Sequence, residues 1–152
     1  MKYYVVADVH GFCSILKDSL KEKGFFNDEE PHKLIVCGDL FDRGAEAVEL
    51  QNFILELLEK DEVILIKGNH EELLVDMLNS WHRASYLESH HNSNGTVDTI
   101  LQLTGTGLAD LYDNPSDVYY KMKETPFMQK ILPAMVDYFE TENHIFVHGW
   151  IP

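Results

Sequence analysis

The chain has 152 residues, of which 45% are hydrophobic, and it carries a formal net charge of −14 at pH 7. This length predicts a single domain, residues 1–152, with a sizeable core. The negative charge argues against binding of nucleic-acid phosphates or anionic membranes through a basic patch, and it is compatible with a site that holds cations. No apolar stretch could span a bilayer and no signal-peptide pattern is present, so we expect a cytoplasmic protein.

Apolar runs rich in β-branched residues alternate with helical patterns over the first half of the chain. Residues 3–7, 34–37 and 63–66 are continuous apolar runs, typical of strands that are covered on both faces. Between them, residues 12–23 and 45–59 carry apolar side chains at helical spacing. The first of these helices would bury Ile15, Leu16 and Leu20. This βαβαβ order predicts a mostly parallel sheet with right-handed crossovers.

The second half of the chain has a weaker pattern. Residues 71–79 show leucines at helical spacing, whereas residues 81–95 lose their period and indicate an irregular polar loop with solvated histidines. A further helix, interrupted by two prolines, is expected between residues 116 and 135. Residues 136–149 predict a hairpin whose second strand covers residues 144–147.

Each predicted strand is followed by polar side chains that suit a metal ion. These are Asp8 and His10 after the first strand, Asp39 after the second, Asn69 and His70 after the third, and His148 after the hairpin. Because the carboxyl ends of parallel strands lie along one edge of a sheet, we expect these groups to converge. Carboxylate, imidazole and amide ligands together suit Mn²⁺, Fe or Zn²⁺. Asp39, on the middle strand, is placed to bridge two ions.

The sequence GDLFDRG, residues 38–44, directly follows the second predicted strand. Asp42 and Arg43 come three and four positions after Asp39, within reach of whatever the metal ions hold. The arginine offers a planar fork that matches phosphate oxygens. Glycines in and near this turn let the backbone approach a tightly coordinated centre.

Four motifs, in order, resemble those of the calcineurin-like metallophosphoesterases. They are DVHG at residues 8–11, GDLFDRG at 38–44, GNHE at 68–71 and VHG at 147–149. Within the family, the likeness is to the phosphoprotein phosphatase type in its small bacterial and phage form. The resemblance implies an α/β fold in which a metallophosphoesterase-like β-sandwich is flanked by helices, in the layer order α/β/β/α.

The resemblance also implies two divalent metal ions, with Mn²⁺ as the expected metal and Fe, Zn²⁺ or Ni²⁺ as alternatives. One ion would be held by Asp8, His10 and Asp39, and the second by Asp39, Asn69 and His148. A hydroxide activated by both ions would then attack the phosphorus of a phosphate monoester.

Catalytic and phosphate-binding roles are implied for a second group of residues. Arg43, together with Asn69 and His70, would bind the substrate phosphate, and His70, oriented by Asp42, would protonate the leaving group. The implied activity is that of a serine/threonine-type protein phosphatase acting on phosphoproteins or small phosphoesters. Two alternatives stay open, a dinucleoside polyphosphate (diadenosine tetraphosphate) hydrolase and a non-catalytic metal-binding fragment. A scaffold domain, however, would need neither the proton donor nor the arginine.

The chain departs from the family pattern in three places. Ala7 stands where the first motif usually begins with glycine, and Trp150 stands where a second glycine usually follows the last motif. A further histidine ligand of the second ion, usually preceded by a second phosphate-binding arginine, would lie beyond Pro152. We therefore expect residues 1–152 to be the N-terminal portion of a longer domain, which leaves open whether this chain alone is active.

Overall fold

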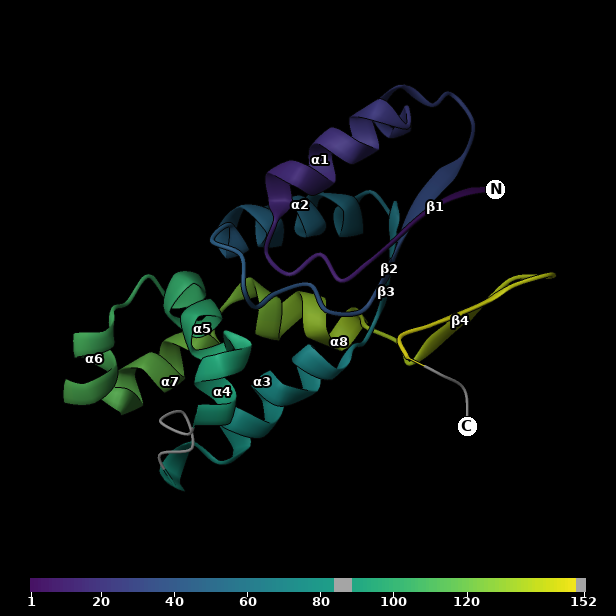
Figure 1. Ribbon diagram of the computed structural model, residues 1–152. Helices are drawn as coiled ribbons and strands as arrows, with labels where there is room; N and C mark the ends of the chain where they lie inside the picture. The colour runs from purple at the N-terminus through teal and green to yellow at the C-terminus, as the bar shows by residue number, and fades with distance from the viewer. Residues whose placement is uncertain (84–88, 150–152) are drawn as a thin grey trace.

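The computed structural model describes residues 1–83 and 89–149 and has a mixed α/β fold (Figure 1). The strands are β1 (Lys2–Ala7), β2 (His32–Cys37), β3 (Val63–Ile66), β4 (Tyr138–Glu140) and β5 (Ile145–Val147). The helices are α1 (Cys13–Glu22), α2 (Ala47–Glu59), α3 (Asn69–Asn79), α4 (Ser89–Asn94), α5 (Thr96–Thr104), α6 (Leu108–Asp113), α7 (Pro115–Lys123) and α8 (Leu132–Ala134). Short turns of 3-10 or π helix are η1 (Phe25–Asn27), η2 (Trp81–Arg83) and η4 (Phe127–Ile131).

Three parallel strands form the first sheet, in the order β1-β2-β3. The central strand β2 is buried from Leu34 to Cys37, as its continuous apolar run predicts. Ile35 pairs with Val5 of β1 on one side and with Ile64 of β3 on the other. Because β1 lies at the edge of the sheet, its Val5 keeps 52% of its surface exposed. The predicted βαβαβ unit is therefore confirmed, with β2 in the middle.

The first sheet has helices on one face and the hairpin β4–β5 on the other (Figure 1). On the helical face, Val36 and Leu65 belong to the main hydrophobic core together with side chains of α1, α2, α3, α5 and α7. On the opposite face, Ile35 packs with a smaller group that includes Phe139 and Phe146 of the hairpin. Burial on both faces explains why the central strand β2 is uniformly apolar from Leu34 to Cys37.

The predicted hairpin is confirmed and is attached to the first sheet through Val136. The N–H of Val136 donates to the carbonyl of Leu65 at 2.9 Å, and its own carbonyl accepts from the N–H of Lys67 at 2.9 Å. The outward-facing side chains Tyr138 and Ile145 keep 59% and 51% of their surface exposed. The two-stranded second sheet therefore covers the first with one face and leaves the other open.

Several details of the second half differ from the prediction. The segment 81–95 is expected to be an irregular loop, but its described part contains η2 and α4. Residues 84–88 of this segment lie outside the described residues. Helices α5 and α6 are absent from the prediction, whereas α7, η4 and α8 correspond to the expected interrupted helix. In α1, Ile15 is 62% exposed instead of buried. Among the described residues, every helix is too short or too polar to cross a membrane.

Candidate metal centre

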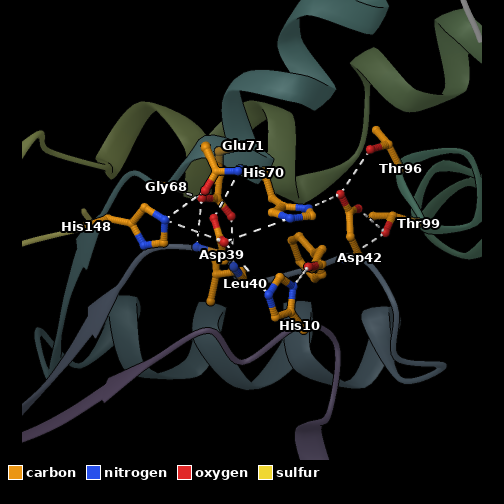
Figure 2. Close-up of polar contacts among 12 residues, drawn as sticks. His10, Asp39, Leu40, Asp42, Gly68, His70, Glu71, Thr96, Thr99 and His148 are labelled. Carbon is orange, nitrogen blue, oxygen red and sulfur yellow. Dashed lines mark hydrogen bonds and ion pairs between the residues drawn. The ribbon is translucent and has the colours of Figure 1, made fainter. Parts of the chain in front are cut away.

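The loops that follow the strands bring His10, Asp39, His70 and His148 together at one edge of the first sheet (Figure 2). Since β2 is the central strand, Asp39 lies between the loop after β1, which carries His10, and the start of α3, which carries His70. The hairpin adds His148 directly after β5. A Cβ atom on Gly38 would collide with the His148 ring, so this close approach requires a glycine.

Three imidazoles point their Nε2 atoms at a single carboxylate oxygen. The distance to Asp39 Oδ2 is 3.5 Å from His148, 3.8 Å from His10 and 4.0 Å from His70. Ligand atoms bonded to one ion at about 2.0–2.2 Å lie roughly 3–4 Å from one another. The spacing therefore fits a metal ion between the carboxylate and each neighbouring imidazole.

Each of these imidazoles is held in place through its other ring nitrogen. The Nδ1 atoms lie 2.9 Å from the Phe41 carbonyl oxygen for His10, 3.0 Å from the Cys37 carbonyl oxygen for His148, and 2.7 Å from Asp42 Oδ2 for His70. A carbonyl oxygen can only accept, so Nδ1 of His10 and His148 carries the hydrogen and Nε2 of the neutral ring presents a lone pair. Such outer hydrogen bonds fix the tautomer and direction that a metal-binding histidine needs.

Two groups of side chains around Asp39 have the composition of metal sites. His10, Asp39 and His70 form one group, and Asp8, Asp39 and His148 form the other; within each group the ligand atoms all lie within 4.8 Å of one another. Asp39 belongs to both, as expected of a bridging carboxylate. The sequence predicts Asp8 and His10 on the same ion, whereas the structure groups Asp8 with His148, so that assignment stays a prediction.

Asn69, the remaining predicted ligand, lies against His148. Its Oδ1 atom is 2.8 Å from Nε2 of His148. Because Nδ1–H of His148 donates to the Cys37 carbonyl, Nε2 of the neutral ring faces the amide oxygen with a lone pair. Two acceptors repel at this distance unless a proton or a cation lies between them. A shared cation would satisfy both atoms, so the residues present fit the predicted metal ion.

Asp42 and His70 form a buried pair beside the cluster, with 2% and 5% of their surfaces exposed. Besides the imidazole, the carboxylate accepts hydrogen bonds from two hydroxyl groups of α5. Thr99 Oγ1 donates to Oδ1 at 2.6 Å, and Thr96 Oγ1 donates to Oδ2 at 3.0 Å (Figure 2). These three donors offset the loss of hydration that burial of a carboxylate entails.

Glu71 joins two of the site loops. Its Oε2 atom accepts from the backbone N–H groups of Asp39 at 3.0 Å and Gly68 at 2.8 Å, and Oε1 accepts from that of Leu40 at 2.8 Å. Burial raises the pKa of the Glu71 carboxyl, while the three backbone hydrogen bonds act to lower it. From its sequence position Glu71 is expected only to complement the N-terminus of a helix. The structure instead shows a buried clamp between the loops after β2 and β3.

The side chain of Arg43 is exposed, and within the described residues it forms no ion pair. Its backbone, in contrast, is closely packed, because a Cβ atom on Gly95 would lie 2.7 Å from the Arg43 nitrogen. The segment expected to be a solvated loop therefore lies against the arginine turn. Its His91 is also buried, with 2% of its surface exposed. Trp150, which stands where the family usually has a second glycine, lies outside the described residues.

Left-handed backbone conformations gather at this centre. Among the described residues other than glycine, positive φ angles occur at Asp8 (53°), His10 (50°), Asp39 (55°), Asp42 (70°), Arg43 (77°) and, away from the site, Asp61 (56°). This conformation costs a residue with a Cβ atom roughly 1–2 kcal/mol. The concentration of such residues at one place is typical of a functional site whose surroundings fix an unfavourable backbone.

Three polar residues of α5 that support the site lie outside the predicted set. They are Thr96, Thr99 and Gln102. They recur every third position between apolar residues such as Val97 and Ile100, which are 5% and 1% exposed. From the sequence alone, polar residues at this spacing next to an apolar stripe indicate the solvent-facing side of a helix. The sequence does not reveal that this side meets the Asp42 turn.

Comparison with known proteins finds similar sequences of two activities. Over 73 residues the chain is 36% identical to "Serine/threonine-protein phosphatase 1" of Salmonella typhimurium, covering 48% of this chain and 31% of that protein. Over 75 residues it is 36% identical to "Bis(5'-nucleosyl)-tetraphosphatase, symmetrical" of Buchnera aphidicola, covering 49% and 26%. A longer match of 138 residues, at 25% identity, joins 87% of the chain to 53% of the asymmetrical bis(5'-nucleosyl)-tetraphosphatase PrpE of Bacillus subtilis. The chain thus spans well under two thirds of these relatives.

Structural comparison finds a solved phosphatase with the same fold as this chain. A solved cold-active protein tyrosine phosphatase superposes with a TM-score of 0.59 at 21% identity, covering 100% of this chain and 44% of that chain. At this identity the likeness concerns the fold alone. The family description "Calcineurin-like phosphoesterase" matches residues 1–152, the whole length of the sequence. The chain therefore belongs to the calcineurin-like phosphoesterase family.

Proposed function

We propose that this chain carries the catalytic centre of a metal-dependent phosphatase of the serine/threonine type, which hydrolyses phosphate monoesters. The observation that carries the proposal is the convergence of the anchored imidazoles of His10 and His148 on Asp39 Oδ2, next to the buried pair of Asp42 and His70. Two divalent ions, with Mn²⁺ as the first choice, would supply a nucleophile at neutral pH and neutralise phosphoryl charge when bound.

The residues around the cluster have separate roles in this proposal. Arg43 binds two phosphate oxygens with its guanidinium fork, since its side chain is exposed and unpaired within the described residues. Asn69 and His70 complete the phosphate site. His70, with Nδ1–H held by Asp42, donates a proton from Nε2 to the leaving oxygen, and the carboxylate stabilises the charged ring. Asp8, His10, Asp39, Asn69 and His148 hold the ions.

The charge beside the centre supports a protein substrate. A groove that begins at Asn69 runs along α3 and is lined by Glu72, Leu73, Asp76 and Asn94. Glu72 and Asp76 also line the neighbouring groove toward Pro133. Their carboxylates repel an extended polyphosphate, whereas a phosphoprotein brings only one phosphate to the site. The similarity to tetraphosphatases nevertheless supports a second candidate, hydrolysis of dinucleoside polyphosphates.

Hydrolysis of p-nitrophenyl phosphate by the 152-residue chain, with Mn²⁺ or with EDTA, tests the reaction. We expect turnover with Mn²⁺ that is lost in EDTA and in the Asp39→Asn variant. Calorimetric titration with Mn²⁺ is measured on the same samples. Binding of Mn²⁺ without turnover would support the non-catalytic metal-binding alternative, and turnover that persists in EDTA would contradict the proposal.

A second assay separates the substrate classes. A phosphoserine peptide and diadenosine tetraphosphate are compared at equal concentrations, and we expect a higher kcat/KM for the peptide. The Glu72→Gln, Asp76→Asn double variant should raise kcat/KM for the tetraphosphate and leave p-nitrophenyl phosphate unaffected. A wild-type preference for the tetraphosphate would favour the second candidate.

A further inference from the structure

The polar face of α5 is the best-connected feature outside the predicted site. Thr96 and Thr99 are fully buried, with 0% and 1% of their surfaces exposed, although each carries a hydroxyl group. Residues three apart lie on the same face of a helix. Both hydroxyl groups therefore point the same way, toward the turn that contains Asp42 (Figure 2).

Thr99 forms two hydrogen bonds with Asp42, one with its side chain and one with its backbone. Its Oγ1 atom donates to Oδ1 at 2.6 Å and accepts from the backbone N–H of Asp42 at 3.0 Å. The single hydroxyl hydrogen is thus used by the carboxylate, and a lone pair is used by the backbone of the same residue. This arrangement fixes the side-chain torsions of Asp42 relative to its own backbone. Thr96, which donates to Oδ2 at 3.0 Å, fixes the second oxygen.

The fixed carboxylate of Asp42 in turn restricts rotation of the His70 imidazole. Asp42 Oδ2 lies 2.7 Å from Nδ1 of the imidazole, so a fixed carboxylate sets the plane and tautomer of the ring. The opposite atom, Nε2, is thereby aimed at the cluster, 4.0 Å from Asp39 Oδ2. We propose that Thr96 and Thr99 are positioning residues that keep Nε2 of His70 directed at the leaving group. This inference rests on the proposed function, in which His70 is the proton donor.

The same helix also fixes the turn on which Arg43 stands. Gln102 Nε2 donates to the carbonyl of Gly44 at 3.0 Å, and Gln102 Oε1 accepts from the N–H of Ala47 at 2.9 Å. Gly95, at the N-terminus of α5, packs on the Arg43 backbone. Helix α5 therefore fixes the position of the proposed proton donor relative to the proposed phosphate-binding turn.

Leaving-group dependence tests the role of Thr99 in proton donation. Dinitrophenyl phosphate has a leaving group that needs no proton, whereas phenyl phosphate needs one. We expect Thr99→Val, which keeps the size and removes the hydroxyl, to lower kcat for phenyl phosphate by about 10- to 100-fold. KM and the rate with dinitrophenyl phosphate should change little, and Thr99→Ser should restore the rate. Thr104→Val is the matched control, because Thr104 Oγ1 bonds the Ile100 carbonyl of its own helix.

A spectroscopic measurement in EDTA tests the same positioning without turnover. The proton on Nδ1 of His70, assigned by its absence in His70→Gln, should give a strongly downfield NMR signal in the wild type. We expect this signal to move or broaden in Thr99→Val and Thr96→Val, and to stay in Thr99→Ser and Thr104→Val. If Thr99→Val does not fold by circular dichroism, Thr96→Val, which removes one bond only, carries the test.

The outcomes distinguish this inference from the proposed function. An unchanged His70 signal, or equal rate losses with both aryl phosphates, would overturn the positioning role. Absence of metal-dependent turnover in the wild type would overturn the proposed function, while the NMR signal would still decide whether the threonines hold the imidazole.

Discussion

The centre has a buried half and an exposed half that are stabilised in different ways. In the buried half, Asp42 and His70 are 2% and 5% exposed and every polar atom of the carboxylate has a partner within the chain. In the exposed half, the His148 side chain is 18% exposed and its Nε2 atom faces the oxygen of Asn69. The first half is preorganised by hydrogen bonds alone. In the second half, the two facing acceptor atoms need a proton or a cation between them.

Asp39 belongs to both halves, so its substitution should have the largest effect. Asp39→Asn keeps the shape of the side chain but removes the charge to which three imidazoles point. We expect turnover to fall by more than about 100-fold, beyond the cost of losing an outer partner of a metal ligand. Calorimetry should show weaker Mn²⁺ binding.

Asp61→Asn is the matched control for this change. Asp61 also has a positive φ angle, of 56°, but lies away from the site and pairs with Lys33. This variant should bind Mn²⁺ as the wild type does. Wild-type Mn²⁺ affinity in Asp39→Asn would show that the carboxylate is not the shared ligand.

His148→Asn addresses the exposed half alone. We expect affinity for one Mn²⁺ ion to fall at least about tenfold, because a ligand contributes no less than its outer partners do. The NMR signal of the His70 Nδ1 proton should stay, since no contact of the buried half is removed. His144→Asn, on the same hairpin, is the control. A changed His70 signal would mean that the two halves are not independent.

Glu71→Gln tests the connection between the halves. The amide nitrogen of the new side chain would face a backbone N–H group, which leaves a buried donor without an acceptor. We expect a loss of about 1–3 kcal/mol in the free energy of unfolding, measured by urea denaturation. Glu72→Gln, at the exposed neighbouring position, should change stability little. Equal stabilities of the two variants would contradict the clamp.

Asp28 follows η1 and contacts Lys2 and Tyr4 of β1, away from the centre, so its substitution should have the smallest effect and leave both halves intact. Hydrogen bonds from Lys2 and then Tyr4 hold the pKa of its carboxyl below the usual value of 3.8. A carboxyl with a lowered pKa in the folded state adds stability above its unfolded pKa and loses it as the pH falls. Asp28→Asn should therefore be less stable than the wild type at neutral pH.

The pH dependence provides the check on this prediction. The stability difference between Asp28→Asn and the wild type should shrink as the pH drops below about 3.8, the unfolded reference value. Thermal melting at several pH values measures it. A difference that is constant over this range would assign the effect to something other than the ionised carboxyl.

The sequence predicts the first half of the fold well because the apolar runs and the positions of the motifs indicate the same strands there. The three strands appear in the sequence as apolar runs, although only β2 and β3 are largely buried, and each is followed by residues of the centre. The error at Ile15 has a topological cause. Its helix packs beside β1 at the edge of the sheet, and Ile15 lines an open groove there together with Val6 and Phe12, so this part of the apolar stripe is left uncovered.

The second half is less predictable because its local preferences are overruled by tertiary contacts. The α4 sequence consists of serine, histidine and asparagine, all weak helix formers. In α5, Thr96 and Thr99 look like solvent-facing positions, and only the fold shows that they meet the Asp42 carboxylate. Burial of a polar side chain depends on a partner 54 or 57 residues away, which a local pattern does not encode.

The left-handed residues of the centre set stability and function against each other. Glycine at the exposed Asp8 would relieve roughly 1–2 kcal/mol of backbone strain, yet it would delete a group that the proposed site needs. At the buried Asp42 the same change would leave three donors without an acceptor, which costs more than the strain it relieves. A directed-evolution screen that rewards heat resistance alone would therefore favour glycine at position 8, so selection of improved variants should measure turnover alongside stability.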